Sequence, residues 1–247
     1  GGDADNFESP RYNLDATLMR VYEDGEPAKL EHFLKWNDQP AKDGDLVFVS
    51  GHPGRTQRIF TVEALEYLRD ERLPHVLDLL RRKEVLLQQY RLEGKEAARR
   101  GRDELFGIQN ARKAYSGMLA GLQDPQTFVS KRGRQDRLLT ALSKSPEHSG
   151  LADAWKEVAE VPKEKAELLD RSVSLRSELL PGYTDSGRES LMAQLLSPAP
   201  IYDDLEMVKL ADEIALLLES RGMNDSIVQE VLAGRSPKQV ASELVSG

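Results

Sequence analysis

The hydrophobic pattern of the sequence changes near residue 60, and this change limits the folds that are open to the chain. From Thr61 onward, apolar residues recur at helical spacing, as Val62, Leu65 and Leu68 do. Before that point, apolar residues stand in short runs bounded by Gly and Pro, which is typical of strands. We therefore expect a mainly α-helical chain, with an irregular helical domain preceded by a short β segment.

Two runs in the first part of the chain predict strands, at residues 16–22 and 45–50. The first is followed by the turn sequence Glu23-Asp24-Gly25-Glu26-Pro27, and the second by the Gly- and Pro-rich residues 51–54. Two strands do not make a stable sheet by themselves. If these runs are strands, we expect their partners to lie outside this chain.

The remainder predicts helices without a fixed repeat. Thr61 is expected to cap the first, and Leu73-Pro74 permits a new start because Pro fits a first turn. Apolar stripes follow at residues 76–90 and 105–122, and the polar residues 93–102 between them are expected to be solvated. Further helical runs are residues 125–143, 151–180, 186–196, 203–221, 224–232 and 237–245, the last capped by Ser236.

Charge and composition exclude several classes of protein. The 42 acidic and 34 basic residues give a net charge of −8, which argues against nucleic acids or anionic membranes as partners. No run approaches the roughly 18 apolar residues that a membrane span needs. The absence of cysteine excludes disulfides, thiolate metal sites and a cysteine nucleophile. The chain begins at Gly1 without Met or a signal peptide, so we expect it to be the middle of something longer.

Common catalytic motifs are absent, and no metal or other cofactor is expected. No two of the four histidines have the spacing, with a Glu, of a helical zinc site. Residues 50–56 lack the G-K-[ST] ending of a phosphate loop, and no G-x-S-x-G elbow occurs. The basic cluster at residues 91–113 is interrupted by acidic residues, which favours a solvated helix face. Asp203, Asp204 and Glu206 are interpreted as features of a helix start.

The first fifteen residues are rich in Gly, Asp and Asn and stand directly before a predicted strand. Their composition alone fits either a binding loop or an Asx-rich turn. Their order, however, is G-G-D-A-D-N-F-E-S-P-R-Y-N-L-D, followed by A-T-L-M-R-V-Y. Three later motifs stand in the same register: G-D-L-V-F-V-S-G-H-P-G-R-T at residues 44–56, N-A-R-K with G-M at residues 110–118, and I-Y-D-D-L-E with A-G-R-S-P at residues 201–237.

Together these four motifs resemble the bacterial dipeptidyl-peptidase family of serine peptidases, the group that includes dipeptidyl peptidases seven and eleven. The resemblance implies a chymotrypsin-like double β-barrel with a large helical domain inserted in it. It also implies an enzyme that removes dipeptides from the free N-terminus of peptides. On this basis we expect residues 1–58 to be part of the barrel and residues 59–247 to be the inserted helical domain.

The resemblance also assigns roles to four residues. Asp15 matches the aspartate of the catalytic triad, which orients the histidine. Asn6 and Phe7 match the pair that fixes the substrate's α-ammonium, and Asn110 matches an asparagine of the helical domain that reaches the same group. Phe7 replaces the usual Trp and Tyr12 replaces a common His, which indicates a divergent branch.

Two hypotheses follow. The first is an internal fragment of a periplasmic or secreted serine exopeptidase, inactive alone because its catalytic His and Ser lie outside the chain. Its partner is a peptide with a free N-terminus, and we expect the full-length enzyme to form a homodimer. The second is a stand-alone helical interaction module without catalysis.

Overall fold

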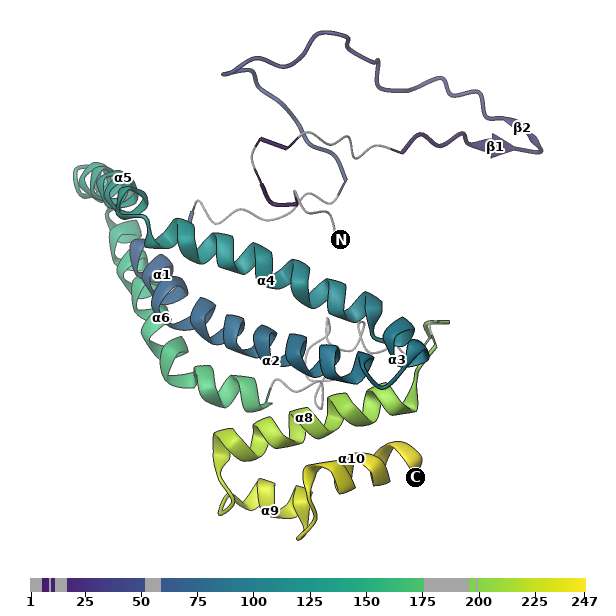
Figure 1. Cartoon of the computed structure of the whole chain (residues 1–247). Helices are drawn as coiled ribbons and strands as arrows, with labels where there is room; N and C mark the ends of the chain where they lie inside the picture. The colour runs from purple at the N-terminus through teal and green to yellow at the C-terminus, as the bar shows by residue number, and fades with distance from the viewer. Residues whose placement is uncertain (1–5, 9, 12–16, 52–58, 176–195, 199) are drawn as a thin grey trace. The chain divides into compact units, whose positions relative to one another are not determined.

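Helices make up most of the chain after residue 60 (Figure 1). The computed structural model describes residues 6–8, 10–11, 17–51, 59–175, 196–198 and 200–247. In chain order the elements are β1 (Tyr22–Glu23), β2 (Glu26–Pro27), α1 (Val62–Tyr67), η1 (Leu68–Arg72), α2 (Leu73–Arg91), α3 (Lys95–Arg100), α4 (Arg102–Gln123), α5 (Pro125–Ser143), η2 (Pro146–His148), α6 (Ser149–Leu175), α8 (Asp203–Arg221), α9 (Ser226–Leu232) and α10 (Pro237–Ser246). The mainly helical fold expected from the sequence is therefore confirmed.

The first helical stretch passes through a proline without a break. Thr61 caps α1 as expected, with its hydroxyl oxygen accepting a hydrogen bond from the Ala64 N–H at 3.1 Å. Pro74 has no N–H and its ring would clash with the carbonyl of residue 70 in a regular α-helix. The chain adopts the wider π-helical turn η1 just before it, where the Leu73 N–H bonds to the Leu68 carbonyl. Helix α2 then starts at Leu73, where the sequence permits a start.

Helices α2 and α4 form a hairpin that is joined by the short α3, and they lie side by side (Figure 1). Leu87 and Tyr90 of α2 are buried against Ala97 of α3, Leu105 of α4 and Leu205 of α8. The polar residues 93–102 are mostly exposed, but Ala97 is buried in this cluster. The solvated segment expected from the sequence is thus found for most of these residues but not at Ala97, because a short polar helix can still bury one small apolar side chain.

The C-terminal helices enclose a second apolar cluster. Its buried members are Ile214, Leu217, Val228, Leu232, Val240 and Ala241. Asp225 caps α9 through its side chain, and Ser236 with Gln239 forms a capping box at the start of α10. Since these caps satisfy backbone donors locally, the bounds of these helices follow closely from the sequence.

A third cluster joins α1 to α5 through Val62, Leu65 and Phe128. The guanidinium groups of Arg69 and Arg132 lie over the Phe128 ring, at 4.6 and 5.7 Å from its centre. Helix α5 begins at Pro125 behind the capping residue Asp124, as the sequence predicts. The predicted helix at residues 186–196 lies almost wholly outside the described residues.

Residues 8–59 form a separate unit, while residues 1–7 belong to the unit that contains residues 60–247. The predicted turn is present, because Asp24 and Gly25 both have positive φ and link β1 to β2 in an antiparallel hairpin. No strand forms at residues 45–50, and within 17–22 only Tyr22 is in a strand. The strand predicted at residues 45–50 is therefore wrong, and the one predicted at residues 16–22 is wrong for its described residues other than Tyr22. A strand requires hydrogen bonds from a neighbour, which its own sequence does not supply.

Candidate functional site

Two side chains that are 104 residues apart in the sequence meet at one hydrogen bond. The Asn6 side-chain N–H donates to Asn110 Oδ1, with 2.6 Å between Asn6 Nδ2 and the oxygen. Both side chains are partly buried. The structure thus brings together two of the four residues that the sequence singles out, from the start of the chain and from helix α4.

The backbone at the first of these positions is unusual. Phe7 has φ of 62°, in the left-handed region that bulky residues rarely adopt. Its side chain is 59% exposed, so no burial of the ring offsets this conformation. Such strain costs about 1–3 kcal/mol and is concentrated at binding and active sites. The turn at Asn6 and Phe7 therefore has the character of a ligand-contacting loop.

The remaining residues singled out from the sequence cannot be placed. Asp15, the expected aspartate of the triad, and Tyr12 lie outside the described residues. Their roles stay predictions from the resemblance.

The Asn6–Asn110 pair leaves acceptor capacity on both amides. A carbonyl oxygen has two lone pairs, and Asn6 uses one of those on Asn110 Oδ1. Among the described residues, none donates a hydrogen bond to Asn6 Oδ1. A primary ammonium carries three N–H donors and no acceptor, so side-chain carbonyl oxygens such as these suit such a group.

A buried carboxylate that binds two residues close to Asn110 along the chain went unnoticed in the sequence. Glu84 of α2 accepts hydrogen bonds from two residues of α4, at 3.0 Å from Gln109 Nε2 and 2.6 Å from Arg112 Nε. Burial by itself would raise the pKa of Glu84, but the hydrogen bonds from Gln109 and Arg112 hold it below its usual value. Gln109 and Arg112 flank Asn110 in the sequence. A Glu in an apolar stripe was the only available signal of this contact.

A second polar cluster joins α2, α3 and α8. Asp204 accepts hydrogen bonds from Tyr90 Oη at 2.8 Å and from Arg100 Nη1 at 2.9 Å. Burial and the neighbouring Asp204 carboxylate raise the pKa of Tyr90 to about 12. Arg100 also lies over the ring of Tyr202. Asp204 is in the first turn of α8, as expected, and it also holds α8 to the other two helices.

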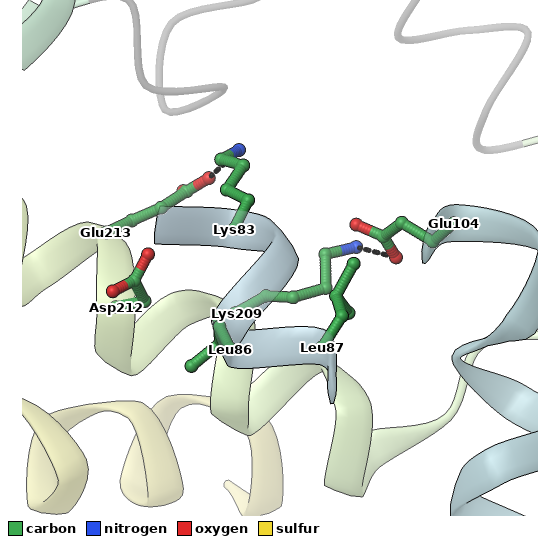
Figure 2. A pocket seen from close by; sticks show the side chains of 7 residues that line it. All are labelled: Lys83, Leu86, Leu87, Glu104, Lys209, Asp212 and Glu213. Carbon is green, nitrogen blue, oxygen red and sulfur yellow. Dashed lines mark ion pairs between the residues drawn. The ribbon is translucent and has the colours of Figure 1, made fainter. Parts of the chain in front are cut away.

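The pocket in Figure 2 is lined by α2, α8 and Glu104 at the start of α4. Its charged groups are paired: Lys83 with Glu213 at 3.6 Å and Lys209 with Glu104 at 3.4 Å, which the dashed lines mark. Burial acts to lower the pKa of Lys209, but its bonds to Glu206 and Glu104 raise it overall. Because the charges satisfy each other, this hollow has the character of a helix interface and lacks the unpaired groups of a ligand site.

In the described parts of the chain, no group of three His, Asp or Glu side chains could hold a metal ion. Nor is any helix in them long and apolar enough to cross a membrane.

Comparison with known proteins gives the family. The model of the family described as Peptidase S46 matches residues 1–181. The Asp/Glu-specific dipeptidyl-peptidase of Shewanella putrefaciens is 30% identical over 157 residues, which are 59% of this chain and 21% of that protein. The dipeptidyl-peptidase 7 of Capnocytophaga gingivalis is 36% identical over 69 residues, 24% of this chain and 10% of that protein.

The match spans about a fifth of the length of the Shewanella protein and about a tenth of the Capnocytophaga protein. No solved structure matches the chain. The similarity therefore rests on sequence alone, and it covers the turn at Asn6 together with helix α4.

Proposed function

The chain belongs to the peptidase S46 family, and from that premise we propose that it is part of a serine exopeptidase that releases dipeptides from the free N-terminus of peptides. The observation that supports this most directly is the hydrogen bond between Asn6 and Asn110. The two relatives named above are dipeptidyl-peptidases, which supports the same reaction. The alternative of a non-catalytic interaction module has no comparable support.

Asn6 and Asn110 bind the α-ammonium of the substrate in this proposal. An exopeptidase must distinguish a terminal ammonium from an amide within a chain, and the two differ in charge and in donor count. Side-chain carbonyl oxygens favour the ammonium, because hydrogen bonds from a charged donor are shorter and stronger than neutral ones. Phe7 lines the same loop, where its exposed ring is available to the substrate.

Asp15 is the orienting member of the catalytic triad in this proposal. Its carboxylate accepts the Nδ1–H of a histidine, which fixes the tautomer and stabilises the imidazolium that forms when serine attacks the peptide carbonyl. The histidine and serine come from parts of the protein outside this chain, and so does most of the double β-barrel. The short span of the match supports this division, and in this proposal the isolated chain has no peptidase activity.

Residues 1–58 belong to the barrel and residues 59–247 to the inserted helical domain in the proposed enzyme. We further place that enzyme in the periplasm or outside the cell and expect a homodimer. Cell fractionation and analytical ultracentrifugation of the full-length protein check these two points.

The test uses the full-length protein and a dipeptide substrate with a fluorogenic leaving group and a free N-terminus. Asn110→Ala is expected to lower kcat/KM by roughly 10- to 100-fold, since a hydrogen bond to a charged group contributes about 1.5–3 kcal/mol. The loss should come mainly from a higher KM, because this contact is present before and during the reaction. Asn6→Ala should act in the same direction.

Asn224→Ala is the matched control, since Asn224 is exposed in the loop before α9. It should leave kcat/KM within twofold of the unaltered enzyme. An Asn110→Ala enzyme with the kcat/KM of this control would rule out the proposed ammonium site.

A further inference from the structure

We propose that Glu84 is a positioning residue that sets the direction in which Asn110 faces the substrate; this rests on the ammonium site proposed above. Glu84 has no assigned role in that site, and its hydrogen bonds go to Gln88, Gln109 and Arg112 and not to Asn110. It acts through helix α4, because its two carboxylate oxygens hold the residues on either side of Asn110.

The geometry of an α-helix explains how a contact on one face of α4 controls the position of a side chain on another face. Successive residues are turned by about 100°, so Gln109 and Arg112 lie on the same face, about 60° apart. Asn110 lies about 100° from Gln109 on the other side, and thus about 160° from Arg112, on the part of α4 that is turned largely away from Glu84. A rotation of α4 by about 20° would move a side-chain tip about 6 Å from the axis by about 2 Å. A hydrogen bond does not survive such a shift.

The apolar contacts between α2 and α4 do not fix this rotation as sharply. Leu87 and Leu105 are buried in the cluster near one end of the hairpin, while Leu122 packs on the cluster near the other. Apolar contacts have no preferred direction, so they define the rotation of a helix less sharply than hydrogen bonds do. Between these clusters, Glu84 contributes directional bonds of 2.6 and 3.0 Å. Its side chain is only 12% exposed.

A role in stability alone explains this arrangement poorly. The Arg112 side chain is 40% exposed although that of Glu84 is only 12% exposed, and a partly solvated ion pair contributes little net stability. What it does supply is one defined arrangement of its partners. Because Gln109 and Arg112 stand on either side of Asn110 in the sequence, fixing them also fixes the direction in which Asn110 faces.

Glu84→Gln is the informative substitution. A carboxylate accepts at both oxygens, one from Gln109 and one from Arg112, whereas an amide has one oxygen and one N–H₂ group. Arg112 then loses its charged acceptor, and Gln109 must turn its amide over to accept from the new N–H₂ group, so both bonds to α4 change. In the full-length enzyme we expect KM for the free-N-terminus substrate to rise about tenfold with kcat within about twofold, since small misplacements of a binding group cost this much or more.

The control is Asp212→Asn. Asp212 is also 12% exposed and also accepts from an arginine at 2.6 Å, but its partner is Arg82 and the pair links α2 to α8. This variant removes an equally buried ion pair without touching the residues beside Asn110. Its KM should stay within about twofold, and thermal unfolding of both variants shows whether either fails to fold.

A double-mutant cycle decides between positioning and general damage. If Glu84 acts through Asn110, Glu84→Gln should raise KM less than about twofold in a protein that already carries Asn110→Ala. An effect of equal size in both backgrounds, an equal effect from Asp212→Asn, or no effect of Glu84→Gln would overturn the inference. If Asn110→Ala alone leaves KM unchanged, the ammonium site fails first and the inference falls with it.

Discussion

The buried apolar side chains of the described residues lie in 60–166 and 200–247, whereas residues 17–51 leave their large apolar side chains exposed. Leu87 in helix α2 is 2% exposed, while Leu46 in the predicted strand is 84% exposed. Both are leucines in apolar runs, so hydrophobicity does not explain the difference. A helix completes its hydrogen bonds within one segment and then packs on another helix, whereas a strand needs a neighbouring strand first. The helical part carries its own partners, and the β part does not.

The largest expected effect is a loss of catalysis with the fold unchanged. Asp15→Asn in the full-length enzyme should lower kcat by about 10⁴-fold, because an amide no longer selects the productive histidine tautomer. Steady-state kinetics measures this, and circular dichroism should show unchanged folding. Asp24→Asn is the control, since Asp24 is exposed in the hairpin turn and its positive φ is tolerated by Asn. A near-normal kcat for Asp15→Asn would show that another residue has this role.

The same substitution, leucine to alanine, tests the difference in burial between the two regions. In the 247-residue chain, Leu87→Ala should reduce the free energy of unfolding by about 2–5 kcal/mol, since it opens a cavity in the α2–α4 cluster. Leu46→Ala should change it by less than about 0.5 kcal/mol. Urea denaturation followed by far-ultraviolet circular dichroism measures both.

The same two substitutions in the full-length enzyme test whether residues 1–58 belong to the barrel. If residues 1–58 complete a barrel there, Leu46→Ala should become clearly destabilising while the effect of Leu87→Ala stays similar. An unchanged, negligible effect of Leu46→Ala in both proteins would contradict the assignment of this segment to the barrel.

The smallest expected effect concerns alkaline pH. Burial and Asp204 raise the pKa of Tyr90 to about 12 in the folded chain, whereas an unfolded tyrosine ionises near pH 10. Between these values the unfolded state has already lost its proton, so stability should fall as pH rises from about 10 toward 12. Tyr90→Phe should reduce this loss by about 1–2 kcal/mol.

Urea unfolding at pH 9 to 12 measures the effect, and Tyr22→Phe is the control because the Tyr22 ring is exposed in β1. If Tyr90→Phe and Tyr22→Phe change the slope equally, the Tyr90–Asp204 contact does not shape the alkaline stability.

Much of the helical fold was predictable because its signals are local. The start of α1 behind Thr61, the start of α5 behind Asp124, and the cap at Ser236 all depend on a side chain and the backbone within three residues of it. The burial of Ala97 was not predictable in the same way. It depends on Leu205, which is more than a hundred residues further along the chain.

The sequence by itself determined the family, the mainly helical class and the two asparagines worth comparing, because motifs and helical periods are properties of short segments. Only the tertiary structure decided that Asn6 Nδ2 meets Asn110 Oδ1 and that Glu84 turns its carboxylate toward the residues flanking Asn110. These contacts join segments that are 25 to 104 residues apart. Their formation depends on how helices pack, and that is set by the free energy of the whole core.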